Sequence, residues 1–267
     1  MCSIQDQFTG FLASNQLHVG SEIGIKDMDW KPTSGFQVPA YVHEEMKSPM
    51  LVGRKAERFL SAYFEQSGTV NLLAENLQVV ENKVTLGELD AIISCEGLVF
   101  HLELVYKFYL FDPLIEGPEI VKWIGPNRKD CLHTKLQKLR EKQFPFLFHP
   151  ATRKQLTELD VHADEIEQEL LFLANCFVPW GFEGNVRFPI DGYWLNRDQF
   201  FRSDFVDCEF FIPSKHEWMV RECPTIPWKS HSEIGVELEK CHAIYRSPLV
   251  WMKSGSFSFE RMFVVWW

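Results

Sequence analysis

Two acidic residues, Asp90 and Glu103, lie on neighbouring strand-like runs near the middle of the chain. Residues 86–93 and 101–107 both alternate polar with apolar side chains, which predicts strands with one polar and one apolar face. The dipeptide Glu96-Gly97 between them fits a two-residue hairpin turn in which glycine takes the positive φ that such turns need. Counting back along both strands from this turn puts Asp90 directly opposite Glu103.

A divalent cation is the ligand that such a pair of acids favours. Directly opposed strand residues have Cβ atoms only ~5 Å apart, where two negative charges repel each other. Mg²⁺ or Mn²⁺ bound by Asp90 and Glu103 would offset that repulsion, because Mg²⁺ prefers one or two carboxylates together with waters and substrate phosphate oxygens. The alternative is a solvated strand face on which Lys107 and His101 balance the acids. The spacing leaves both interpretations open.

Apolar periodicity predicts the elements around this hairpin. A first helix is expected over residues 54–65, where apolar residues recur at helical spacing before the stop signal of Gly68. Glu57 on this helix would point toward the acids if the helix packs across the sheet, and is otherwise a surface residue. Three strands at residues 72–80, 86–94 and 98–110 follow, and then a helix at residues 130–143.

The second of these helices lies in a locally basic stretch. Between residues 128 and 142, six basic residues stand against two acidic ones, inside a chain whose net charge is −10. Lys and Arg neutralise the phosphates that flank a scissile bond, so a basic helix beside an acidic metal site suits a phosphodiester substrate. Arg128, Lys135 and Gln143 are the expected substrate-binding residues, and contact with nucleic acid would be local to this helix. A solvated helix face is the other interpretation.

Length and composition exclude several classes of protein. The 267 residues are 46% hydrophobic and 24% charged, close to the globular average, which argues against an intrinsically disordered chain. No apolar run approaches the ~18 residues that span a bilayer, and the first residues lack the layout of a signal peptide, so we expect a cytoplasmic protein without a membrane partner. Neither Cys-x-x-Cys nor His-Glu-x-x-His occurs, which argues against a zinc site.

Three segments are predicted along the chain. Residues 1–50 are polar and broken by prolines, which indicates a loop-rich lead-in. Residues 51–150 hold the first helix, the hairpins and the basic helix. Residues 151–267 are expected to begin with an acidic helix, at about residues 160–175, and to continue as a β-rich C-terminal region that could bind a protein partner.

The order helix, three-stranded meander, helix, with Asp90 on the second strand and Glu103 on the third, resembles the PD-(D/E)XK phosphodiesterase superfamily. Four runs of the sequence look more closely like a bacterial branch of it, the Domain of Unknown Function 1853 family. This resemblance covers roughly residues 53–147. It is carried by Gly87-Glu88-Leu89-Asp90, His101-Leu102-Glu103-Leu104, Lys107-Phe108-Tyr109-Leu110 and Trp123-Ile124-Gly125-Pro126-Asn127.

The resemblance implies an α/β (α+β) fold: a restriction-endonuclease-like αβββαβ core with a mixed central sheet, followed by the β-rich C-terminal region. It makes Asp90 and Glu103 the metal ligands, Glu57 the acid of the first helix, and Lys107 the lysine that orients or activates the attacking water. Val105 stands where the usual Glu-x-Lys spacing of the superfamily would put that lysine. Lys107 is two residues further along and on the same strand face.

Two functions follow as hypotheses. The first is a metal-dependent nuclease that cleaves phosphodiester bonds with a Mg²⁺-activated water. The second is a catalytically inactive nuclease-fold module that binds nucleic acid or a protein partner. A Lys107 that reaches the metal site favours the enzyme, whereas a Val105 that fills this space favours the binding module. A serine hydrolase is not indicated, because the sequence has no Gly-x-Ser-x-Gly.

Overall fold

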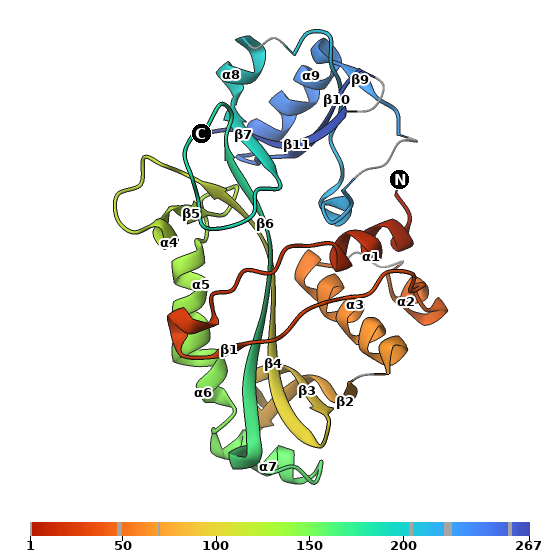
Figure 1. The fold of residues 1–267 in the computed structure, drawn as a ribbon, viewed down its shortest axis with the longest axis vertical. Helices are drawn as coiled ribbons and strands as arrows, with labels where there is room; N and C mark the ends of the chain where they lie inside the picture. The colour runs from red at the N-terminus through yellow and green to blue at the C-terminus, as the bar shows by residue number, and fades with distance from the viewer. Residues whose placement is uncertain (1, 47–49, 69, 203–204, 222–225, 256–257) are drawn as a thin grey trace. The chain divides into compact units, whose positions relative to one another are not determined.

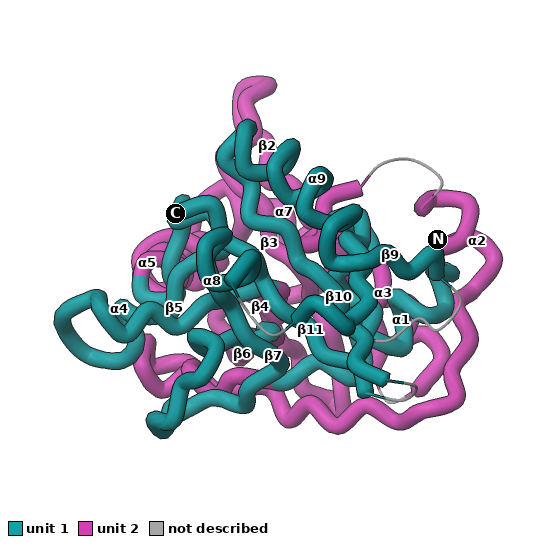
Figure 2. The backbone as a smooth tube through the Cα atoms, turned by 90° about the horizontal axis from the view of Figure 1, so that it is seen from above, with its two compact units in different colours: residues 1–15, 107–133, 174–267 teal, residues 16–106, 134–173 magenta. Residues whose placement is uncertain are grey.

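The chain forms two compact units, and each unit is made from more than one stretch of sequence (Figure 2). The computed structural model describes residues 2–46, 50–68, 70–202, 205–221, 226–255 and 258–267. Unit 1 comprises residues 1–15, 107–133 and 174–267, and unit 2 comprises residues 16–106 and 134–173. The segments 1–50, 51–150 and 151–267 are therefore each divided between the two units.

The predicted three-stranded meander is present in unit 2. Glu96 and Gly97 take φ values of 51° and 83° and form the two-residue turn, because both positions of such a turn need a positive φ. The residues that flank the turn pair as the register required, and the ladder continues to Ala91 opposite Leu102. The three strands are antiparallel, and β4 runs on into unit 1. Their bounds are β2 (Asn71–Glu81), β3 (Val84–Cys95) and β4 (Leu98–Phe111).

The expected first helix is α3 (Val52–Ser67), which is somewhat longer than the sequence predicted. It buries Ala56, Phe59 and Phe64, the apolar residues that recur at helical spacing. Gly68 ends it with a φ of 63°, a left-handed conformation that glycine adopts at little cost. Before α3, unit 2 contains short elements where a loop-rich lead-in was expected. They are η1 (Gly20–Ile23), β1 (Lys26–Asp27) and α2 (Ala40–Glu45).

The basic stretch is helical, as predicted, but it is not one regular α-helix. It begins as α5 (Leu132–Lys138), widens into a π-helical turn, η2 (Leu139–Gln143), and ends as α6 (Phe144–Phe146). Helix α3 and this segment lie on opposite sides of β4 (Figure 1). Helix α7 (Pro150–Thr157) follows, and its Leu156 packs in a core with Leu89 and Ile92 of β3.

The prediction of an acidic helix at residues 160–175 is wrong. Most of this segment is strand β6 (Ile166–Pro179), which is preceded by the short 3₁₀ helix η3 (Ala163–Glu165). Residues 170–178 are almost fully buried. Strand β6 lies between β4 and β7 (Gly192–Asn196) in the sheet and pairs in parallel with β1 in unit 2. A strand that is covered on both faces carries a continuous apolar run, and periodicity cannot distinguish such a run from a buried helix.

Unit 1 contains the expected β-rich C-terminal region, together with several helices. Strand β7 is parallel to both β6 and β11, whereas β10 is antiparallel to β11, so the sheet is mixed. Phe200, Phe210 and Ile234 are central to the core of this region. The unit's elements are α1 (Ile4–Leu12), α4 (Glu119–Lys122), β5 (Trp123–Ile124), β7 (Gly192–Asn196), α8 (Arg197–Arg202), β8 (Glu209–Phe211), η4 (Lys215–Glu217), β9 (Lys229–Ser230), α9 (His231–His242), β10 (Leu249–Ser254) and β11 (Ser258–Val265).

None of the helices in the described part of the chain combines the length and the apolar character that crossing a membrane requires.

Candidate functional site

Asp90 and Glu103 lie in unit 2, where strands β3 and β4 begin to separate. The ladder ends at Ala91 and Leu102, and Asp90 and Glu103 are the next residues of their strands. Side chains take over the backbone hydrogen bonding beyond this point. The N–H of Leu104 donates to Asp90 Oδ2 at 3.0 Å, and the backbone N–H of Asp90 donates to the carboxylate of Glu103. The two acids are thus tied to each other's strands.

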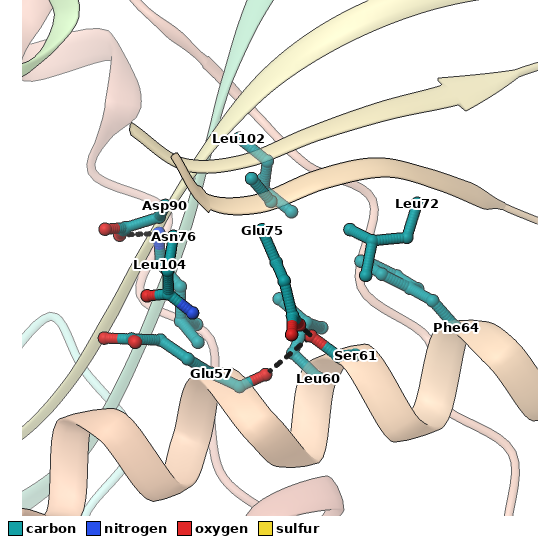
Figure 3. Close-up of a pocket in the computed structure, with 11 residues that line it drawn as sticks. Glu57, Leu60, Ser61, Phe64, Leu72, Glu75, Asn76, Asp90, Leu102 and Leu104 are labelled. Atoms are coloured by element: carbon teal, nitrogen blue, oxygen red, sulfur yellow. Dashed lines mark hydrogen bonds between the residues drawn. The ribbon is translucent and has the colours of Figure 1, made fainter. Parts of the chain in front are cut away.

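A small pocket between α3 and the meander brings a third acid to this place. Glu57 of α3 and Asp90 of β3 both line it, and Figure 3 shows their carboxylates directed to the same side, with Asn76 of β2 near both in this view. The space inside is about 10 Å³, which is room for about one water molecule or ion. The sequence-based expectation that Glu57 points from the helix toward the acids matches this placement.

Arg54, one turn before Glu57 on α3, neutralises part of the acidic surface. Its guanidinium lies 2.9 Å from Glu57 Oε2 and 2.9 Å from Glu88 Oε1, and it also donates to the side-chain oxygen of Asn76. Glu88 lies on the predicted polar strand face that also carries Asp90. The carboxylate of Glu88 forms an ion pair with Arg54. The arginine therefore fixes Glu57 against β2 and β3.

Burial raises the pKa values of all three carboxyl groups. Burial raises the pKa of Asp90 to about 7, and the nearby charge of Glu103 adds to the effect. Burial likewise raises the pKa of Glu103 to about 7, against the opposing charge of Lys135. The pKa of Glu57 is raised to about 7 by burial and then by Asp90. Carboxyl groups ordinarily ionise near about pH 4, so these three retain protons near neutral pH that a bound cation would displace.

Glu103 is the most enclosed of the three acids, and its carboxylate is hydrogen-bonded at both oxygens. His101 Nε2 lies 3.0 Å from Oε1, and the amide of Gln143 donates to Oε2. Gln143 in turn accepts a hydrogen bond from Lys135 Nζ at 2.7 Å. On the other side of the imidazole, Gln168 Nε2 lies 3.1 Å from His101 Nδ1. The expected substrate-binding residues Lys135 and Gln143 are therefore brought next to Glu103.

The π-helical turn η2 explains how Gln143 reaches this position. A π-turn adds a residue per turn and rotates the following side chains relative to a regular α-helix, and such turns are frequent at functional sites. Gln143 is the last residue of η2, eight positions after Lys135, yet their side chains are hydrogen-bonded. The widened turn thus supports the bonds of Gln143 to both Lys135 and Glu103.

Lys107 and Arg128, the other two basic residues expected at the site, belong to unit 1. Lys107 Nζ forms an ion pair with Asp130 at 2.7 Å. Arg128 pairs with Asp112 at 2.6 Å, and its guanidinium lies 3.8 Å from the ring centre of Trp267. Both side chains therefore have partners within their own unit.

The family model for the Domain of unknown function (DUF1853) matches residues 24–265. The chain belongs to the DUF1853 family. The match extends well beyond residues 53–147, where the sequence resemblance was recognised, so the family's domain includes most of unit 1 as well. Comparisons with curated proteins and with solved structures found no match to the chain.

The donor set of this DUF1853 chain fits a magnesium ion better than a softer metal. In the described part of the chain, no group of three or more His, Cys, Asp and Glu side chains is arranged to hold a metal ion. Mg²⁺ does not require such a cage, because it retains several waters and binds through one or two carboxylates. Asp90 and Glu103 are the two carboxylates that would hold it, and the side chain of Glu57 faces the same pocket as Asp90.

Some residues of the site in this DUF1853 chain were not identified from the sequence. His101 was considered only as a charge that balances the acids, although its position two residues before Glu103 places both on one strand face. Gln168 was missed because its segment was expected to be helical, and Arg54 and Asn76 carry no pattern of their own. Their roles follow from the packing of α3, β2 and β6 around the hairpin.

Proposed function

We propose that unit 2 is a metal-dependent phosphodiesterase that cleaves nucleic acid, with Asp90 and Glu103 as the ligands of Mg²⁺ or Mn²⁺. One observation carries the proposal: Glu57 and Asp90 face one pocket, Asp90 is hydrogen-bonded to the strand of the buried Glu103, and Lys135 is tied to Glu103 through Gln143. A protein that only needed a stable core would gain nothing from burying like charges, which destabilise it. A cation and an anionic substrate together would compensate this arrangement.

The order of elements supports the same proposal. Apart from the short elements α4, β5 and η3, the order along the chain is α, β, β, β, α, β: helix α3, the strands β2, β3 and β4, the helical segment from α5 to α7, and strand β6. This is the order of the αβββαβ core of the PD-(D/E)XK superfamily, which the sequence resembles. Asp90 on the second strand and Glu103 on the third occupy the metal-ligand positions that this resemblance implies.

Each side chain has a distinct task in this proposal. Asp90 and Glu103 hold the cation, and a bound Mg²⁺ would neutralise phosphate charge and lower the pKa of a water. Glu57 is a proton acceptor near neutral pH, because its raised pKa lies close to that of the solution.

We assign to Lys135 the charge-stabilising role that the resemblance implied for Lys107. The charge of Lys135 acts on both Asp90 and Glu103, and its ammonium is tied to Glu103 through Gln143. The exposed Lys138, Arg140 and Lys142 continue the basic surface along which flanking phosphates would lie.

Cleavage of defined substrates by the purified protein tests this proposal. Single- and double-stranded DNA and RNA are incubated with Mg²⁺, Mn²⁺ or EDTA, and the products are separated on a denaturing gel. We expect cleavage that requires the metal and is lost in Asp90→Asn. Glu158→Gln, an exposed acid at the end of α7, is the matched control. Cleavage that persists in EDTA, or in Asp90→Asn, contradicts the proposed metal site.

The second candidate is an inactive module that binds nucleic acid or protein. It is favoured by the residue at the strand position where the superfamily has its lysine. Val105 fills that position and is buried, and Lys107 is paired with Asp130. The same incubation distinguishes the two functions, because an inactive module would retard the oligonucleotides in a native gel without cutting them.

A further inference from the structure

The carboxylate of Glu103 is held in one orientation by two neutral donors in the protein interior. Glu103 and His101 are both fully buried, with 0% of their surface exposed. His101 Nε2 contacts one carboxylate oxygen at 3.0 Å, and Gln143 donates to the other. With the backbone N–H of Asp90 the carboxylate accepts three hydrogen bonds, so one of its four lone pairs remains for a further ligand.

The orientation of Gln168 determines which ring nitrogen of His101 carries hydrogen. Gln168 Nε2 lies 2.8 Å from the carbonyl oxygen of Phe144 and 3.1 Å from His101 Nδ1. A carbonyl oxygen can only accept, so the amide group must present its NH₂ to it, and the second hydrogen of that NH₂ points to Nδ1. Nδ1 therefore accepts, and the ring hydrogen resides on Nε2, from which it donates to Glu103.

We propose that His101 and Gln168 are positioning residues for Glu103: Gln168 selects the Nε2–H tautomer of His101, and this hydrogen holds the carboxylate in place for the divalent cation. This inference rests on the proposed function. Outer groups that orient a metal ligand typically contribute ~10–100-fold to metal affinity. The hydrogen-bond chain connects β6 to β4 and the helical segment, so the cation would bind a carboxylate that is already oriented.

The tautomer can be read directly in the metal-free protein. Spectra that correlate the ring nitrogens and carbon-bound protons of ¹⁵N-labelled histidine distinguish Nε2–H from Nδ1–H, and His101→Gln identifies the signal of His101. We expect the Nε2–H form in the wild type and a loss of this preference in Gln168→Leu. An Nδ1–H form in the wild-type protein overturns the inference, whether or not Gln168→Leu folds.

Calorimetric titration with Mn²⁺ tests the consequence for binding. We expect Gln168→Leu and His101→Leu to bind Mn²⁺ ~10–100-fold more weakly than the wild type. His101→Gln retains an amide donor and should recover part of the affinity. Gln137→Leu, on the exposed side of α5, is the matched control.

The outcomes separate this inference from the proposed function. A wild-type protein that does not bind Mn²⁺ contradicts the proposed function, while the histidine spectra still decide the tautomer. If the wild-type protein binds Mn²⁺ and a folded Gln168→Leu variant binds it with equal affinity, the positioning role alone is overturned. Near-UV circular dichroism of each variant shows whether its packing is native.

Discussion

The raised pKa of Glu103 predicts that the metal-free protein loses stability as the pH rises from about 4.5 to about 7. The pKa of this group is 4.5 in its ordinary state and about 7 in the folded protein, so the folded state binds more protons than the unfolded state within this window. The free energy of unfolding therefore falls as the pH rises, and the stabilising effect of the bound proton is lost above about pH 7.

The size of the effect follows from the pKa change. A difference of one pKa unit corresponds to about 1.36 kcal/mol, so the change from 4.5 to about 7 amounts to about 3 kcal/mol for Glu103. Asp90 and Glu57 change the free energy of unfolding in the same direction. Their combined effect is smaller than the sum of three separate effects, because the three groups repel one another and do not titrate independently.

Urea unfolding in EDTA at several pH values between 5 and 8 measures this trend for the wild type and for Glu103→Gln. The variant cannot titrate at this position, so the difference in unfolding free energy between the two proteins should change by about 3 kcal/mol across the window, in favour of the variant at high pH. Glu158→Gln is the control for general effects of removing a charge. If the difference in unfolding free energy between the wild type and Glu103→Gln stays constant from pH 5 to 8, the electrostatic account of the site is refuted.

Further predictions concern the cation, the lysine and the packing of β3. Mn²⁺ affinity should rise with pH between about 5 and 8, because the cation displaces protons from the carboxyl groups, and calorimetry in buffers of different ionisation enthalpy should detect the protons that are released. Lys135→Met should lower kcat/KM for cleavage ~10²–10⁴-fold. Lys107→Met removes a partly exposed ion pair with Asp130 and should change the free energy of unfolding by less than ~1 kcal/mol. A larger loss of cleavage in Lys107→Met than in Lys135→Met would return the charge-stabilising role to Lys107. Gly87→Ala should destabilise the protein by ~1–3 kcal/mol in thermal unfolding, because the added Cβ would lie 2.7 Å from the ring of Phe146, whereas an unchanged melting temperature would show that this ring moves freely.

The sequence was most informative where local rules determine the structure. The Glu96-Gly97 turn fixes the hairpin register, because a two-residue turn with positive φ leaves one pairing of the strands. That register predicted Asp90 opposite Glu103, and the observed ladder reaches the preceding pair, Ala91 and Leu102. The apolar spacing of α3 likewise predicted which side of the helix is buried.

Long-range packing explains what the sequence did not reveal. Strand β6 was mistaken for a helix because its apolar run is buried on both faces, and with it Gln168 was lost from the predicted site. The partners of Lys107 and Arg128, namely Asp130 and Asp112, are set by tertiary contacts in unit 1. No spacing rule connects such residues.

The position of Lys135 shows why the absence of lysine at residue 105 does not exclude catalysis. A charge-stabilising lysine must bring its ammonium to the carboxylates, and the element that carries it is immaterial. Side chains on β4 alternate between two faces, and that of Glu103 accepts a hydrogen bond from Gln143, which belongs to the helical segment that also carries Lys135. A lysine on this helix therefore lies on the same side of β4 as Glu103. Val105 is then free to pack in the core, and the cleavage measured for Lys135→Met against Lys107→Met decides which lysine acts.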